Sequence, residues 1–464
     1  MKPQLSLLTL CLLLSACGTP APRPDSAIVA PPSWQSPSVQ NATRDNQQWW
    51  THFASPQLAG LIEQAQVGSH DLAAAIARVR QARAATVVAG GSQLPEITAG
   101  LNANRQKLLR GSGYSQLDAD SSNKAVDYFD ANLSASYEID FWGGQSATRE
   151  SARQSLRASQ FDQATVELTL LSDVANRYTQ ALSLQEQNRI AGLNLANAEN
   201  VLQLVQTRFN AGSATALELA QQKSLVAAQQ RQLPTVQQQA QDARIALAAL
   251  LGRSIQDLPA SLETFDQLQW PQIAAGVPSD LLTRRPDIAR AEAQLAAAKA
   301  DVAVARAAML PKVTLSAQLG SGSNQFDDLL RSPFYNLTAG LLAPVFNNGR
   351  LAAERDKATA RQEELLETYR GAIINGFADV EKALNSIRGL DEQRQWQSEE
   401  LNQAQTAFNI SQSRYQAGAE DLLTVLETQR TLYAAQDLNV QLRLARMQAS
   451  IALYKALGGG WQTL

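Results

Sequence analysis

The chain has 464 residues, of which 45% are hydrophobic and 18% are charged, and its formal net charge is −3. This length is enough for two or three domains. So small a net charge gives no electrostatic reason to expect a nucleic-acid partner.

The N-terminus has the pattern of a secretory signal over residues 1–16. Lys2 supplies the positive charge, residues 5–14 the apolar stretch, and the small residues before Cys17 the processing site. The apolar stretch is too short to cross a bilayer as a helix. The processing site resembles a bacterial lipobox, which implies cleavage before Cys17 and lipidation of that residue. An ordinary signal peptide that ends beside a cysteine is the alternative.

Cysteine usage limits the chemistry of the mature chain. Cys11 leaves with the signal, so only Cys17 is retained, and we expect neither a disulfide nor a cysteine-based metal site. By resemblance to sorted lipoproteins, Gly18 in place of an aspartate implies the outer membrane as the destination. Residues 17–50 are rich in Pro, Ser and Ala, which predicts an extended linker that leads away from the lipid anchor.

The rest of the chain presents one order of elements twice, which predicts an internal two-fold repeat. One Ala-rich helical run ends at Leu94-Pro95 and another at Leu310-Pro311, and two strand-like segments and a long helical stretch follow each. Residues 252–281 connect the halves, and 458–464 form a C-terminal tail. We expect opening helices over 51–93 and 282–309, strand pairs over 94–142 and 310–346, and helical hairpins over 143–251 and 347–457.

Two-residue alternation marks the four strand-like segments. In the second segment, apolar residues from Phe129 to Phe141 alternate with polar ones, which puts one face of a sheet in an apolar medium and the other in a polar one. The segments are long enough to cross a bilayer when tilted. Aromatic residues at the ends of the second segment, Tyr128 with Phe129 and Phe141 with Trp142, suit an interfacial girdle. A half-buried sheet on a soluble core is the alternative.

Four strands alone cannot form a closed barrel. They leave two open edges, and backbone groups at an open edge have no partners in lipid. Closure needs about eight strands, and a water-filled lumen needs more. A bilayer-spanning sheet from this chain must therefore be completed by further copies of it. The physical argument predicts an oligomer and leaves the number of copies open.

Very long helices follow the strand pairs. Residues 144–207 contain no proline and residues 351–413 show the same pattern, with apolar residues recurring every three to four positions. Helices of about sixty residues would be about 90 Å long. Their other faces are rich in Gln, Asn, Ser and Ala, which suits a solvated coiled-coil surface as well as the wall of a water-filled tunnel.

Taken together, these features resemble the outer-membrane factor family, the TolC-like and OprM-like exit ducts of tripartite efflux and type I secretion systems. The resemblance covers nearly all of the mature chain. It rests on Trp49–Phe53, on the Arg-Arg-Pro-Asp-Ile sequence at 284–288, and on the strand-to-helix joints Tyr137–Gly143 and Pro344–Gly349. The lipobox resembles that of the lipoprotein branch, which serves resistance-nodulation-division and ABC-type exporters.

The resemblance implies the fold class and the partners. The expected protein is an α+β membrane protein and a homotrimer. Its twelve-stranded outer-membrane β-barrel, four strands from each chain, continues into a long periplasmic α-helical barrel with an equatorial segment at 252–281. A periplasmic adaptor and an inner-membrane pump would be its partners. The lipid on Cys17 would anchor it in the outer membrane.

The resemblance also assigns the two turns at which the long helices reverse. In the family these periplasmic tips dock the helical hairpin of the adaptor, a role carried here to Arg208, Gly212, Arg414, Tyr415 and Gly418. The glycines suit a turn that requires a residue without Cβ. A plain helical turn that binds no partner is the alternative.

A gate is expected next to the second tip. Helical spacing places Leu423, Glu427 and Arg430 on one face. In related ducts a leucine and an acidic residue at the first two positions narrow the closed mouth, and Glu427 stands where an aspartate is more usual. A three-fold ring of carboxylates repels itself unless each finds a hydrogen-bond donor. Three ordinary solvated residues are the alternative.

The sequence gives little support for an enzyme. His52 and His70 are the only histidines, and neither belongs to a metal-ligand pattern; His70 is expected to cap a helix. We predict no catalytic residues, no metal site and no cofactor. A periplasmic adaptor and a non-channel outer-membrane scaffold lipoprotein are the remaining alternatives.

Overall fold

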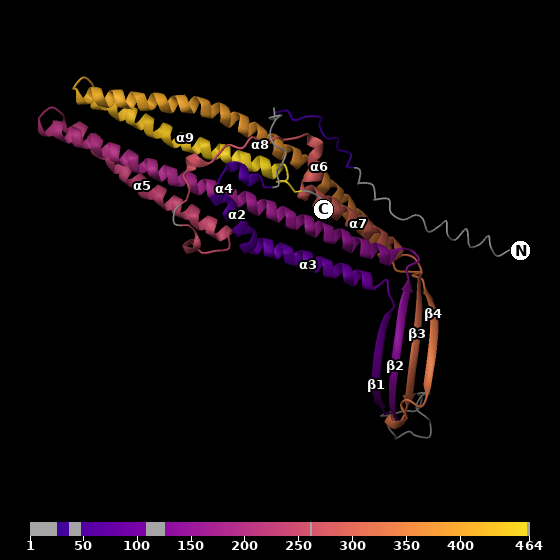
Figure 1. Cartoon of the computed structure of the whole chain (residues 1–464). Coiled ribbons are helices and arrows are strands. Elements are labelled where there is room, and N and C mark those ends of the chain that lie inside the picture. The colour runs from indigo at the N-terminus through magenta and orange to yellow at the C-terminus, as the bar shows by residue number, and fades with distance from the viewer. Residues whose placement is uncertain (1–25, 37–47, 108–125, 260–261, 462–464) are drawn as a thin grey trace.

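The computed structural model describes residues 26–36, 48–107, 126–259 and 262–461. A four-stranded sheet lies at one end and long helices run away from it (Figure 1). The elements are η1 Trp49–Phe53, α2 Pro56–Gly68, α3 His70–Gly91, β1 Glu96–Gln106, β2 Val126–Ile139, α4 Gly144–Asn210, α5 Ala216–Leu250, η3 Ile255–Asp257, η4 Phe265–Gln267, η5 Pro278–Asp280, α6 Leu281–Arg284, α7 Pro286–Ala307, β3 Lys312–Ser323, η6 Phe326–Asp328, β4 Pro333–Leu342, α8 Arg350–Gln416 and α9 Leu422–Ala456.

The predicted repeat is present in this order. The series α3-β1-β2-α4-α5 recurs as α7-β3-β4-α8-α9, with α4 and α8 each 67 residues long and α5 and α9 each 35. A helix of 67 residues is about 100 Å long. Pro234 lies inside α5 without ending it. None of the helices in the described ranges has both the length and the hydropathy of a membrane-spanning segment.

The strands form one antiparallel sheet in the order β1-β2-β3-β4. The register aligns the apolar residues into continuous rows; one row runs Ala99, Leu133, Leu319, Tyr335 from strand to strand. This apolar face is solvent-exposed in the single chain: Leu101 is 69% exposed and Leu337 72%. The alternative of a half-buried sheet on a soluble core is therefore wrong for this chain, because the sheet lies at one end of the molecule beyond the helices (Figure 1).

The opposite face of the sheet is polar. Thr98 and Ser134 are hydrogen-bonded through their hydroxyls at 2.7 Å, and Lys312 pairs with Glu138 at 3.3 Å. Tyr128 lies on this polar face, because its neighbour Phe129 belongs to the apolar one. The prediction that both rings join one interfacial girdle is therefore wrong for Tyr128.

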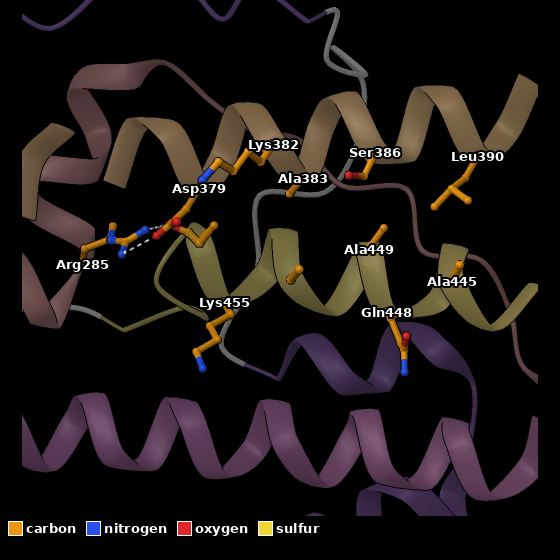
Figure 2. A pocket seen from close by; sticks show the side chains of 12 residues that line it. Arg285, Asp379, Lys382, Ala383, Ser386, Leu390, Ala445, Gln448, Ala449 and Lys455 are labelled. Atoms are coloured by element: carbon orange, nitrogen blue, oxygen red, sulfur yellow. Dashed lines mark hydrogen bonds and ion pairs between the residues drawn. The ribbon is translucent and has the colours of Figure 1, made fainter. Parts of the chain in front are cut away.

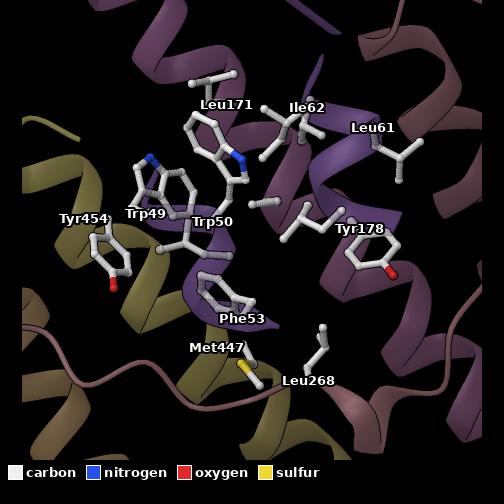
Figure 3. Packing of buried hydrophobic residues seen from close by; sticks show 14 of the residues in the cluster. Trp49, Trp50, Phe53, Leu61, Ile62, Leu171, Tyr178, Leu268, Met447 and Tyr454 are labelled. Carbon is white, nitrogen blue, oxygen red and sulfur yellow. The ribbon is translucent and has the colours of Figure 1, made fainter. Parts of the chain in front are cut away.

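The main hydrophobic core lies where the two halves meet (Figure 3). It joins the middle of α4 to the C-terminal parts of α5 and α9. Trp49 and Phe53 of η1 are fully buried, and the Trp49 ring stacks on Tyr454 of α9 with 5.2 Å between ring centroids. On the other side of this core the Tyr178 hydroxyl donates to Glu263 at 2.9 Å. Arg443 of α9 also donates to the Phe265 carbonyl at 3.1 Å, so the predicted equatorial segment 252–281 packs against helices of both halves.

One local prediction is wrong. Ser69, not His70, caps α3: its hydroxyl accepts from the backbone N–H of Leu72, whereas His70 is the first helical residue. Part of the predicted linker is fixed in place, because the Trp34 indole donates to the Gly276 carbonyl at 3.0 Å and the backbone N–H of Gln35 donates to Glu381 at 2.6 Å.

Cys17 and the signal lie outside the described residues, as does most of the segment between β1 and β2. Lipid anchoring therefore stays a prediction.

A close backbone approach joins the end of α2 to the turn after α5. A Cβ on Gly252 would lie 2.2 Å from the Gly68 carbonyl oxygen, and Gly252 has φ +66°, in the left-handed region. A side chain is therefore excluded both by space and by backbone conformation.

We expect Gly252→Ala to destabilise the protein by more than the about 1–2 kcal/mol that the left-handed backbone costs alone, because the helices must also separate. The measurement is the thermal unfolding midpoint of the purified protein. Gly192→Ala is the matched control: it lies inside α4 with nothing within 4 Å of the added Cβ, so it should not lower the midpoint. Equal midpoints for Gly252→Ala and the parent protein would contradict the expectation.

Candidate functional site

The first tip is the five-residue turn between α4 and α5. Gly212 has φ +74°, and the carbonyl of Arg208 accepts from the backbone N–H of Ser213 at 2.8 Å. Thr215 and Glu218 then form a reciprocal capping box at the start of α5. The turn is closed by its own hydrogen bonds, and glycine is required at the left-handed position.

The second tip, between α8 and α9, repeats this geometry. Gly418 has φ +76°, and the carbonyl of Arg414 accepts from the backbone N–H of Ala419 at 2.9 Å. Asp421 caps α9 by accepting from Thr424, and these hydrogen bonds from the Thr424 backbone and hydroxyl hold the pKa of its carboxyl below the usual value. The Arg414 guanidinium pairs with Glu420 at 3.1 Å, within its own hairpin.

Arg208 connects the two tips. Its guanidinium donates to the carbonyl of Tyr415 at 2.6 Å and lies over the ring of that tyrosine, 4.5 Å from the centroid. Tyr415 is only 1% exposed. Burial raises the pKa of the Tyr415 hydroxyl, the Arg208 charge lowers it, and Glu218 raises it further, so the phenol is neutral at ordinary pH.

The predicted docking residues therefore differ in how exposed they are. Tyr415 is buried between the hairpins, Arg208 is partly exposed, and Gly212, Arg414 and Gly418 are exposed at the turns. The contact between Arg208 and Tyr415 was not predicted, because no sequence pattern marks a pairing between residues so far apart in the chain. The docking role itself stays a prediction.

The three predicted gate residues share one face of α9. Leu423, Glu427 and Arg430 are exposed, with Leu423 54% exposed, whereas Leu422 and Leu426 of the same helix are buried in a cluster between the hairpins. An exposed leucine beside an exposed carboxylate is available to a neighbouring copy of the chain. Their action as a gate stays a prediction.

A hollow of about 570 Å³ lies between α8 and α9 near the junction of the two halves. At one end Arg285 is held by Asp379 at 3.1 Å (Figure 2) and by the carbonyl of Ala456 at 3.0 Å. Asp287 also pairs with Arg285, at 2.7 Å. Burial lowers the pKa of Arg285, but the hydrogen bonds and charges of the two aspartates raise it overall. Arg285 therefore ties α7 to α8 and to the end of α9.

No cluster of three or more His, Cys, Asp or Glu within the described ranges is arranged to hold a metal ion.

We expect Arg208→Gln to loosen the contact between the hairpins, because it removes the cation–π contact and the charged donor to Tyr415. The loss should be about 1–2 kcal/mol, seen as faster amide hydrogen exchange both across residues 411–419 and at the end of α4 that carries Arg208. Arg414→Gln is the control, since Arg414 bonds only within its own hairpin among its described contacts. Arg414→Gln should change amide hydrogen exchange only at the turn between α8 and α9 and leave exchange in α4 unchanged. Unaltered exchange in Arg208→Gln would refute the role of this contact.

Comparison with known proteins gives consistent matches over nearly the whole chain. Residues 61–253 and 277–459 match the family model of the outer membrane efflux protein. The chain is 63% identical to the pyoverdine export outer membrane protein OpmQ of Pseudomonas aeruginosa, over 99% of this chain and 97% of that protein. It is 32% identical to the cation efflux system protein CusC of Escherichia coli, over 98% of this chain and 99% of that protein.

Solved structures agree with this assignment. The outer-membrane channel OprN is similar with a TM-score of 0.88 at 26% identity, over 96% of this chain and 99% of OprN. A structure of CusC has a TM-score of 0.84 at 29% identity, over 95% and 99% of the two chains. The predicted resemblance and the predicted outer-membrane channel fold are confirmed, and the adaptor and the scaffold are excluded as alternatives. The chain belongs to the outer membrane efflux protein family and is an outer-membrane exit duct of an efflux system.

Proposed function

We propose that three copies of this chain assemble into a passive duct that exports a pyoverdine-class siderophore. The observation that carries the assembly is the exposed apolar face of the sheet between two unpaired edge strands, β1 and β4. Lipid would cover that face, and only the edges of other copies can satisfy the backbone groups of β1 and β4. Three copies of four strands give a barrel wide enough for a hydrated lumen.

The cargo is proposed from the relatives. Proteins named for pyoverdine export in Pseudomonas aeruginosa and Pseudomonas putida are 63% and 60% identical to this chain over 99% of its length. A relative named for toluene efflux is 33% identical, and CusC, named for cation efflux, is 32% identical. Cargo thus differs among relatives, and the much higher identity to the pyoverdine exporters favours a siderophore over a solvent, a metal cation or a drug.

Export would depend on partners that supply the energy. In this proposal a periplasmic adaptor docks at the tips around Gly212 and Gly418, and an inner-membrane pump of resistance-nodulation-division or ABC type loads the duct. The exposed turns support docking there, because their backbone is accessible while the cluster beneath them is buried. No catalytic residue, metal or other cofactor takes part. Lipid on Cys17 would hold the duct in the outer membrane.

The gate would lie at the same tips. Around a three-fold axis, Leu423 and Glu427 of each copy would form an apolar ring and an acidic ring, with Arg430 one turn further along α9. Three carboxylates brought together repel one another unless donors hold them, so the closed state would depend on donors from neighbouring chains. Adaptor docking would separate the tips and open the rings.

We expect Glu427→Ala to raise the single-channel conductance of the purified oligomer in planar bilayers, because it removes the acidic constriction. Glu427→Asp is the matched variant: it keeps the carboxylate and should conduct as the parent does. Identical conductance of Glu427→Ala and the parent would sink the gate assignment without touching the duct.

We expect a strain that lacks this chain to retain its siderophore in the periplasm and to lose most of it from the medium, measured by mass spectrometry of both fractions. Re-expression should restore export, and re-expression of Gly252→Ala should restore less because less protein assembles. Normal siderophore export in the deletion strain, with another exported compound retained instead, would refute the proposed cargo.

A further inference from the structure

Two strands of the sheet carry adjacent aromatic residues, Tyr128-Phe129 on β2 and Phe334-Tyr335 on β4. Successive side chains of a strand point to opposite faces, so each pair puts one ring on each face. Phe129 and Tyr335 lie on the apolar face, where a membrane interface explains them, and Phe129 meets Phe326 edge-on at 5.6 Å. The membrane does not explain Tyr128 and Phe334, which lie on the polar face.

Glycines on the strand between them make room for these two rings. Gly320 is the register partner of Phe334, and a Cβ built on Gly320 would lie 2.7 Å from a ring atom of Phe334. A Cβ on Gly322 would lie 2.3 Å from the Tyr128 hydroxyl oxygen. Both rings therefore lie over the backbone of β3. They are still 42% and 44% exposed, so part of each ring is open to the space in front of the sheet.

A carboxylate accompanies the rings on the same face. Asp130 is two residues from Tyr128, is the register partner of Gly322, and accepts hydrogen bonds from the side-chain amides of Asn102 and Asn132, each at 3.0 Å. These donors are neutral, so they orient the carboxylate without cancelling its charge. Glu138, near the other end of the strand, is instead paired with Lys312.

We propose that Tyr128, Phe334 and Asp130 form an aromatic collar inside the barrel, at the end of the sheet away from the helices, which binds the positively charged planar ring of a departing solute. This inference rests on the proposed duct, in which the polar face lines the lumen. Aromatic rings attract cations and stack with flat solutes, and the carboxylate selects for positive charge. Such a contact must be weak, because conduction requires the solute to leave.

The test uses the purified oligomer in planar bilayers and three probes: proflavine, a planar cation; tetraethylammonium, a cation without a ring; and naphthalenesulfonate, a planar anion. The wild-type channel should show brief current interruptions with proflavine that last at least twice as long as those with either other probe. Tyr128→Leu and Phe334→Leu keep apolar bulk over the glycines but remove the ring. Each should shorten the proflavine events about two- to fivefold, the effect of one exposed cation–π contact.

Tyr335→Leu is the matched control, since it removes a ring of β4 from the opposite face and should leave the proflavine events unchanged. Equal event durations for all three probes, or for the wild type and both leucine variants at normal conductance, would overturn the collar and leave the duct intact. An oligomer that does not conduct even with Glu427→Ala, which removes the acidic ring of the proposed gate, would overturn the duct, and the collar with it. If the leucine variants do not assemble, the comparison of the three probes on the wild type decides.

Discussion

The rest of the structure depends on how the four-stranded sheet satisfies its edges. Backbone N–H and C=O groups of β1 and β4 point out of the sheet, and in lipid each unpaired group costs several kcal/mol. The apolar face, exposed along all four strands, has no partner within the described part of the chain. A single copy therefore leaves the backbone groups of its edge strands unpaired and its apolar face exposed to water. Association of copies in a membrane removes both costs.

The helices extend this constraint over a long distance. Each of α4 and α8 is continuous from the strand joint to a tip, so copies held together at the sheet must also run side by side as helices. The core around Trp49, Tyr178 and Tyr454 fixes the two hairpins of one chain relative to each other. At the far end the buried cluster under the tips and the contact of Arg208 with Tyr415 hold them again. The tips are thus the part farthest from the restraint of the membrane.

Much of the fold follows from local patterns. Alternation predicted four strands, and the three-to-four residue periodicity predicted long helices whose ends agree with the structure to within a few residues. These features depend on neighbours in sequence, which a pattern records. The capping of α3 was misassigned because serine and histidine stand side by side, and only the geometry shows that Ser69 accepts the hydrogen bond from Leu72.

The features that the sequence did not predict depend on which distant residues meet. Register decides that Phe334 lies opposite Gly320 and that Tyr128 reaches Gly322, and a shift by one residue would exchange the two faces. The contact of Arg208 with Tyr415 likewise depends on the tips of the two hairpins lying side by side. Glycine at both left-handed positions predicted a tight turn at each tip. No sequence pattern predicted that one arginine would join the two tips.

The two ends of a passive duct have different physical requirements. At the tips, apolar burial and the charged hydrogen bond from Arg208 to the Tyr415 carbonyl hold the two hairpins of one chain together. Along the barrel a strong contact would trap the cargo, since nothing at that end supplies energy to release it. Small polar side chains and exposed rings over glycine satisfy that second requirement, because each offers a solute only a shallow, solvated contact that thermal motion can break.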